Sequence, residues 1–93
     1  MTIVSLHGFS SRIERQTYLL PKGSRILSVC VKQEHIYISV EHDANAKMLE
    51  EPVEFVILKE GRRFNVEGYH FLGTIVLDFG NTIYQVFYRK NKE

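Results

Sequence analysis

The fold is decided by residues 19–40, which read LLPKGSRILSVCVKQEHIYISV. A Pro-x-Gly turn at 21–23 opens a run rich in β-branched residues, Ile26–Lys32, and the polar turn at 33–35 closes it. The next run, Ile36–His42, alternates apolar and polar residues, as expected of the returning strand of a hairpin. Two such runs separated by a short polar turn are typical of a β-hairpin, so the stretch predicts an antiparallel sheet with one face half-buried.

Four further runs show the same alternation, and turn residues or loops separate them. They are Ile13–Leu20, Val53–Lys59, His70–Asp78 and Thr82–Arg89. The last two are joined by Phe79-Gly80-Asn81, a glycine-containing connection of the usual hairpin length. We therefore predict an all-β fold, a small antiparallel sheet of about six strands curled into a barrel or a sandwich.

Period-two alternation also assigns side chains to faces, because successive residues of a strand point to opposite sides. The sets expected to share a face are Leu27, Val29 and Val31, then Ile36, Ile38 and Val40, and then Val53, Phe55 and Ile57. Gly73 lies inside a run, where glycine weakens a sheet and often marks a bulge or a sharp bend. The alternative for Gly73 is the close approach of a ligand to the backbone.

One segment does not resemble a strand. Residues 43–51 contain good helix formers, Asp43 is a suitable N-cap, and Pro52 ends the segment. Nine residues make a marginal helix, so we expect a surface loop with one short helical turn near 44–51.

Length and composition place the chain among small globular domains. Its 93 residues form one domain, 1–93, with an ordinary share of apolar residues. The apolar runs are too short to cross a bilayer, and no secretory signal is recognisable at the start, so no membrane partner is expected. Cys30 is the one cysteine, which favours a reducing, cytoplasmic location.

Charge is balanced overall, at a formal net value of +1, but it is unevenly distributed. Residues 1–33 are basic, residues 34–60 are acidic, and the remainder is basic again. Charges on paired strands that complement one another would explain this pattern. The alternative is a basic face built from both ends of the chain and directed at an anionic partner. A net charge near zero argues against general nucleic-acid binding, for which a clear basic excess is expected.

Residues that carry chemistry are sparse. The histidines at 7, 35, 42 and 70 have no cysteine pairs or helical His-x-x-x-His spacing beside them, so no metal site is expected. Cys30 lies among valines as a small apolar residue. No nucleophile with a positioned base is recognisable. The sequence therefore predicts no catalytic residue, no cofactor and no enzyme.

The strongest candidate for a binding site lies between residues 62 and 71. Arginines beside aromatic residues and a glycine break can hold an anionic or planar ligand through forked hydrogen bonds and stacking. The ligand-binding residues predicted here are Arg62, Arg63, Tyr69 and His70. The alternative is a charged turn in which the arginines pair with the acidic segment and the aromatic residues enter the core.

The final run, Thr82–Arg89, is apolar on both faces. Ile83 and Phe87 lie on one side, and Tyr84, Val86 and Tyr88 lie on the other. A monomer rarely keeps such a patch exposed. We therefore expect a homo-oligomer, most simply a dimer.

Several turn and core residues carry a resemblance to a known family. The pattern Leu-Pro-x-Gly at 20–23, Ile-Leu-Ser-Val at 26–29, Leu-Gly-Thr at 72–74 and Val-Phe at 86–87 resembles a small, uncharacterised β-rich domain family of bacteriophages and bacteria. The resemblance covers residues 13–89 and departs from the pattern at 43–69. It implies a phage-type accessory protein of the host-cell cytoplasm and transfers no active site.

Two classes of function follow. The first is a non-enzymatic accessory protein that counters host defence by sequestering a small anionic, nucleotide-like ligand or by binding a host protein. The second is a structural or assembly module that acts through homo-oligomerisation.

Overall fold

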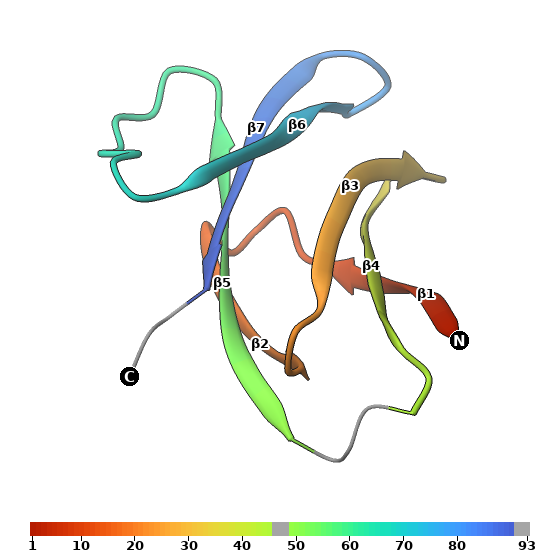
Figure 1. The fold of residues 1–93 in the computed structure, drawn as a ribbon. Coiled ribbons are helices and arrows are strands. Elements are labelled where there is room, and N and C mark those ends of the chain that lie inside the picture. Colours follow the sequence, from red (N-terminus) through yellow and green to blue (C-terminus); the bar gives the residue numbers. More distant parts are fainter. Residues whose placement is uncertain (46–48, 91–93) are drawn as a thin grey trace.

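The computed structural model describes residues 1–45 and 49–90, and within them the chain forms seven β-strands (Figure 1). The strands are β1 (Thr2–Phe9), β2 (Arg15–Pro21), β3 (Arg25–Lys32), β4 (His35–Asp43), β5 (Glu50–Lys59), β6 (His70–Leu77) and β7 (Thr82–Lys90). No segment of the described residues forms a helix that could cross a membrane. The predicted all-β class is confirmed.

The strands form two antiparallel sheets that face each other. The three-stranded sheet has the order β1-β4-β3, and the four-stranded sheet has the order β2-β5-β7-β6. Figure 1 shows the two sheets packed as layers, with β4 and β5 each flanked by neighbours on both sides. The sheets do not close into a barrel, so of the two predicted architectures the sandwich is the one observed.

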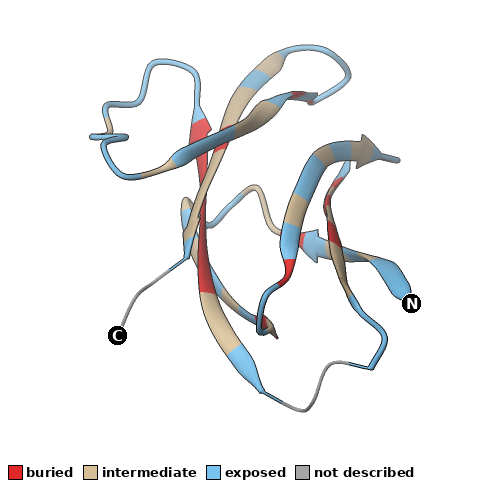
Figure 2. Ribbon diagram, in the orientation of Figure 1, coloured by how far each residue is buried: buried red, intermediate tan, exposed pale blue. Residues whose placement is uncertain are grey.

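The core lies between the two central regions of the sheets. Ile36, Ile38 and Val40 of β4 are buried against Val53, Phe55 and Ile57 of β5, as the alternation predicts. Figure 2 shows that burial is concentrated on β5, whose other face is also covered. Val56 and Leu58 on that outer face are buried as well, so residues 55–58 are apolar on both sides, and Glu54 is also buried.

Strand β1 has no counterpart in the sequence prediction, which left residues 1–12 without structure. Its inner face carries the small or polar residues Ser5 and His7, so the segment lacks clear apolar alternation. The strand forms because β4 offers it an unbroken antiparallel partner from Thr2 to Phe9. Pairing with β4, a strand distant in the sequence, therefore decides the structure of this segment.

Strand β3 differs from its predicted face pattern at Leu27. A bulge between Ile26 and Ser28 shifts the register against β4. Ile26, Val29 and Val31 pack against the core, whereas Leu27 is exposed. The prediction that Leu27 shares the inner face is wrong, because one extra residue in a strand reverses the alternation before it.

The predicted helical turn near 44–51 is also wrong at its carboxyl end. Glu50 and Glu51 belong to β5 and pair with Pro21 and Leu20 of β2. Residues 44 and 45 form a turn in which Asp43 Oδ1 accepts the Asn45 N–H at 2.9 Å. The middle of the predicted turn, residues 46–48, lies outside the described residues.

Gly73 marks a bulge, as predicted. The register of β6 against β7 shifts between Phe71 and Gly73, which leaves Leu72 as the extra residue. A Cβ atom at Gly73 would lie 3.0 Å from Val29 Cγ1 on β3. The glycine therefore allows the edge strands of the two sheets to approach each other, and the structural explanation of Gly73 holds.

The Pro-x-Gly turn is fastened to the four-stranded sheet. The N–H of Gly23, whose φ is +84°, donates to Glu51 Oε2 at 2.7 Å. Lys90 Nζ donates to the same carboxylate oxygen at 3.2 Å and to the Ser24 carbonyl at 2.6 Å. Burial alone would raise the pKa of Glu51, but the bonds from Gly23 and Lys90 outweigh it and lower the pKa.

Candidate functional site

Two neighbouring hollows open at the end of the sandwich where β1 and β5 terminate. They share Ser11 and Arg12 of the loop between β1 and β2. The first, of about 530 Å³, is lined by Gly8–Arg12 and Glu34–Tyr37. The second, of about 470 Å³, is lined by Ser11, Arg12, Glu14, Ile57, Lys59, Arg62 and Tyr84. Mouths of β structures are frequent ligand sites, because loops there surround one end of a rigid core.

The shared loop is held in place by its own hydrogen bonds. Gln16 Nε2 donates to the Ser10 carbonyl at 2.7 Å and to the Ile13 carbonyl at 3.0 Å. The Ile57 N–H of β5 donates to the Glu14 carbonyl at 2.8 Å. These bonds tie both ends of the loop to the four-stranded sheet, so the backbone of Arg12 is held in a fixed position relative to the sheet.

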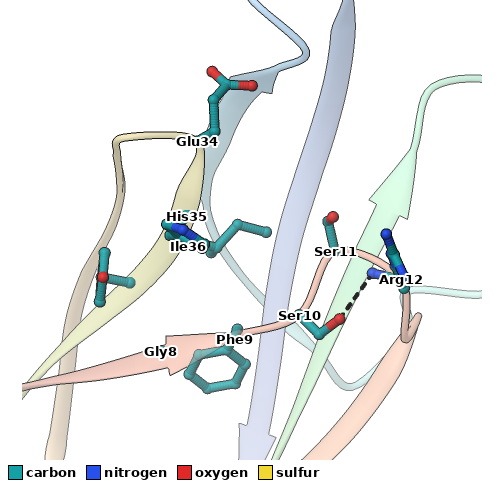
Figure 3. Close-up of a pocket in the computed structure, with 9 residues that line it drawn as sticks. Gly8, Phe9, Ser10, Ser11, Arg12, Glu34, His35 and Ile36 are labelled. Atoms are coloured by element: carbon teal, nitrogen blue, oxygen red, sulfur yellow. Dashed lines mark hydrogen bonds between the residues drawn. The ribbon is translucent and has the colours of Figure 1, made fainter.

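The first hollow has a balanced lining. Figure 3 shows His35 and Ile36 of β4 opposite Ser10–Arg12, where the Arg12 N–H donates to Ser10 Oγ at 3.2 Å. Arg12 contributes a positive charge and Glu34 a negative one, and Glu34 Oε1 also accepts the Phe79 N–H at 3.3 Å. The mixed charge gives this hollow no clear preference for an anion or a cation.

The second hollow is cationic. Arg12, Lys59 and Arg62 contribute three positive side chains against the single carboxylate of Glu14. Arg62 Nε lies 3.2 Å from Glu14 Oε1, and the Arg62 guanidinium remains mostly exposed. No other hydrogen bond from this guanidinium occurs within the described part of the chain. Its Nη groups are therefore available to an oxyanion, which a guanidinium can bind through two parallel bonds.

The floor of the second hollow comes from the core. Ile57 is buried there, and Tyr84 is half-buried beside it on β7, where it pairs with Lys59. Lys59 and Arg62 belong to one turn, in which the Arg62 N–H donates to the Lys59 carbonyl at 3.1 Å and Gly61 has a φ of +87°. The turn places both cations at the rim, above an apolar and aromatic base.

The four residues predicted to bind a ligand do not form one site. Arg62 lines the second hollow, whereas Arg63 is exposed in the loop between β5 and β6. Tyr69 is bound to Glu54 on the outer face of the four-stranded sheet. His70 lies beside Tyr88, with ring centroids 5.2 Å apart. The structure instead brings Arg62 together with Arg12 and Lys59. Arg12 is distant in the sequence, and Lys59 lies just before the predicted segment.

Tyr69 belongs to a cluster around Glu54, a charged residue that is only 6% exposed. Glu54 Oε2 accepts from Arg15 Nε at 2.8 Å, and Oε1 accepts from Tyr69 Oη and from Arg89 Nε, both at 3.0 Å. The Arg89 guanidinium also lies over the Tyr69 ring, 4.4 Å from its centroid. The cluster joins β2, β5, β7 and the loop before β6.

The Glu54 carboxylate is held ionised. Burial alone would raise its pKa, but hydrogen bonds from Arg15, Tyr69 and Arg89 outweigh burial and lower the pKa. A carboxylate of this kind accepts hydrogen bonds and is unsuited to donate a proton near neutral pH. The cluster therefore acts as a structural clamp on the sheet, and its members are paired with one another.

The outer face of the four-stranded sheet carries two apolar pairs, Phe71–Phe87 and Val76–Ile83, on either side of the polar pair Thr74–Gln85. We call the four apolar residues the apolar strip. Phe71, Val76 and Ile83 are exposed, and the rings of Phe71 and Phe87 are in edge-to-face contact with centroids 5.4 Å apart. On the other face of β7, Val86 is in the core and Tyr84 and Tyr88 pack against it. One face of β7 is apolar because it packs in the core. The other face is apolar but open to solvent, as part of the apolar strip.

Comparison with known proteins adds one finding. A family model described as a domain of unknown function (DUF7352) matches residues 10–93, the range that contains β2–β7. No curated protein matches the chain. No solved structure matches it either.

Proposed function

Since the chain belongs to the DUF7352 family, whose description names no function, we propose a function from its surface. The protein binds a small phosphate-bearing anion, such as a nucleotide, in the second hollow. The observation that supports this proposal is the grouping of Arg12, Lys59 and Arg62 around one open hollow, with Glu14 as the single carboxylate.

The arrangement suits recognition by charge and shape. Arg12 comes from the loop after β1, and Lys59 and Arg62 come from the turn after β5, so cations approach the hollow from two sides. Glu14 orients Arg62 through its Nε and leaves the Nη groups to a ligand. Half-buried Tyr84 offers an aromatic side chain to the organic part of the ligand.

We propose binding without catalysis. The Glu14 carboxylate is paired with Arg62, so the hollow offers no free general base. The wider role that the resemblance to phage domains implies would follow directly. An accessory protein that holds a signalling nucleotide tightly removes it from a host defence pathway, and it needs no turnover to do so.

The test is calorimetric titration with linear and cyclic nucleotides and with inorganic phosphate. Arg12→Ala/Lys59→Ala is expected to weaken the affinity more than tenfold, because a bond to a charged group contributes about 1.5–3 kcal/mol. Both side chains are exposed, so the melting curve should not change.

Arg25→Ala is the matched control. Arg25 is an exposed arginine that faces one carboxylate, Glu41, at 3.4 Å, much as Arg62 faces Glu14, but it lies on β3 away from the hollow. Its loss should leave binding unchanged. A wild-type protein that binds neither phosphate nor any nucleotide contradicts the proposal, and so does an equal loss of affinity in the control.

A second candidate is an assembly module, and the apolar strip favours it. Three exposed apolar side chains lie on the outer face of β6 and β7, on either side of the Thr74–Gln85 pair, where a second copy of the protein could cover them. In this case association, and no ligand, would be the function of the domain.

A further inference from the structure

The two sheets have four edge strands, and three of them carry features that discourage pairing with another chain. Strand β2 has Arg15 at one end and Pro21 at the other. Strand β3 has Arg25, Lys32 and a bulge. Strand β6 has a bulge and lies against β3 at Gly73. Charges, prolines, bulges and cover by a neighbour are the usual protections of a sheet edge.

The remaining edge strand, β1, has no charge, proline or bulge, and Tyr18 of β2 covers it at its carboxyl end, at Gly8. Its sequence, TIVSLHGF, contains no acidic residue, lysine, arginine or proline. Its register with β4 is unbroken over all eight residues. Val4 and Leu6 are 57% and 61% exposed on its outer face. A long, uncharged and regular edge strand is a template for strand addition.

The free hydrogen-bonding groups of β1 can be identified. The Ala44 N–H donates to the Met1 carbonyl at 2.8 Å, so Met1 and the odd-numbered residues after it direct their backbone groups toward β4. The backbone groups of Thr2, Val4, Leu6 and Gly8 therefore point to the open edge. Consistent with this, the Gly8 carbonyl accepts a bond from Tyr18 Oη at 2.5 Å.

We propose that β1 pairs antiparallel with β1 of a second copy of this chain, about a two-fold axis at Ser5. In this register Val4 of one copy lies opposite Leu6 of the other, and Thr2 lies opposite Gly8. Val4 and Leu6 then exchange both backbone bonds across the axis, and the Gly8 N–H donates to the Thr2 carbonyl, while the Gly8 carbonyl keeps its bond from Tyr18 Oη. The two three-stranded sheets become one continuous sheet across the dimer.

The absence of charged side chains on β1 favours a second copy of this chain as its partner, rather than a strand of another protein. Antiparallel pairing of a strand with itself places like residues near each other, so any charge on it would be repelled. The lack of charged side chains on β1 removes this obstacle. In the stated register Val4 and Leu6 of both copies also form one apolar group on the outer face, which burial stabilises. The proposal does not rest on ligand binding, because the hollow proposed to bind the anion is lined by residues outside β1.

The first test measures mass by light scattering over a range of protein concentrations. Wild type should form a dimer at tens of micromolar, and Val4→Lys/Leu6→Lys should have half its mass. Leu19→Lys is the matched control, because Leu19 is 62% exposed on the edge strand of the other sheet. It should remain a dimer. A circular dichroism spectrum and melt of each variant, recorded at low concentration, verify that the monomer fold is intact.

The second test uses amide hydrogen exchange, which separates edge pairing from packing of faces. In the dimer the amides of Val4 and Leu6 should be protected, and in the double lysine variant the same positions should exchange fast. The amides of Ser5 and His7 should be protected in both, since β4 binds them. A monomeric wild type, a double variant that stays dimeric, or fast exchange at Val4 and Leu6 in the dimer would each overturn the proposal.

Discussion

At the scale of single residues, Glu54 shows how the fold uses a buried charge. Taking a carboxylate out of water is unfavourable unless donors replace the lost hydration. Arg15, Tyr69 and Arg89 supply these donors from three different parts of the chain. The carboxylate therefore adds side-chain bonds between strands that are already neighbours in the sheet, and it fixes the loop before β6 to them through Tyr69.

Replacing Glu54 by Gln is expected to destabilise the protein by about 2–3 kcal/mol, the scale of hydrogen bonds to charged groups. The loss follows because Arg15 and Arg89 are left close together with no anion between them. Glu60→Gln is the control, since Glu60 is an exposed carboxylate at the end of β5 and should have little effect. Urea unfolding of the two variants measures the difference. Equal stabilities would show that the cluster is incidental.

Acid should destabilise the protein through the same group and through Glu51. Both carboxyls have pKa values below the ordinary value of 4.5 in the folded state. A lowered folded-state pKa contributes stability above the unfolded-state value, and this stability is lost as the pH falls through the folded-state pKa. The melting temperature should therefore fall below pH 4.5, and Glu54→Gln should show a shallower fall. Parallel profiles for both proteins would contradict this assignment.

The alternation of Val53, Phe55 and Ile57 correctly places Glu54 on the other face of its strand. It could not identify the partners, because Arg15 and Arg89 lie on other strands and their positions depend on which strands are neighbours. Charge complementation across the sheet was one of the two explanations for the uneven charge distribution. The Glu54 cluster is an instance of it, since Arg15 and Arg89 come from the basic ends of the chain and Glu54 from its acidic middle.

At the scale of elements, the bulge at Gly73 fixes how β6 meets β3. Gly73→Ala should cost about 1–3 kcal/mol, the usual cost of overpacking, and Gly73→Val should cost more. The added Cβ would lie 3.0 Å from Val29 Cγ1, an atom of a stiff β-branched side chain.

A second variant makes this prediction specific. In a Val29→Ala background the neighbouring atom is removed, so Gly73→Ala should cost less than it does in the wild type. Thermal melts of the four proteins of this cycle supply the comparison. The same cost in both backgrounds would mean that the penalty arises elsewhere in β6.

Element prediction succeeded where alternation is regular and failed where long-range pairing decides. The hairpins β3–β4 and β6–β7 follow from local turn chemistry and were predicted with nearly correct bounds. Strand β1 was missed, because its inner face carries Ser5 and His7 and only β4 makes it a strand. The face of Leu27 was wrong, since the bulge before Ser28 has no sequence signal of its own.

At the scale of the whole molecule, the apolar strip is a candidate for association. If the domain assembles through the strip, Phe71→Ser/Ile83→Ser should lower its mass in solution and leave the melting curve of the monomer unchanged. Phe79→Ser is the matched control, because Phe79 is a fully exposed phenylalanine at the tip of the β6–β7 turn, away from the strip. Sedimentation velocity reports both results. An unchanged mass in the double variant would contradict assembly through this face.

The candidate hollow was only partly accessible to sequence reasoning. Arg62 was identified, because an arginine pair beside a turn is a local signal. Arg12 and Lys59 were not, since they reach the hollow from the loop after β1 and the end of β5. The alternative of a basic face built from both ends of the chain includes the segment of Arg12, but Lys59 lies in the acidic segment 34–60. The order of the strands is what brings these residues together.

The order of the strands also has a consequence for the route by which the chain folds. Among the described strands, only the pairs β3–β4 and β6–β7 are consecutive in the sequence. Strand β5 lacks a sheet partner until β2 and β7 pair with its two edges, and until then residues 55–58 expose apolar side chains on both faces. Topologies dominated by distant pairings fold slowly, and an unpaired apolar strand associates readily with other chains. We expect the yield of refolding from urea to rise as the protein is diluted, with the strand at the centre of the native core as the source of the losses at high concentration.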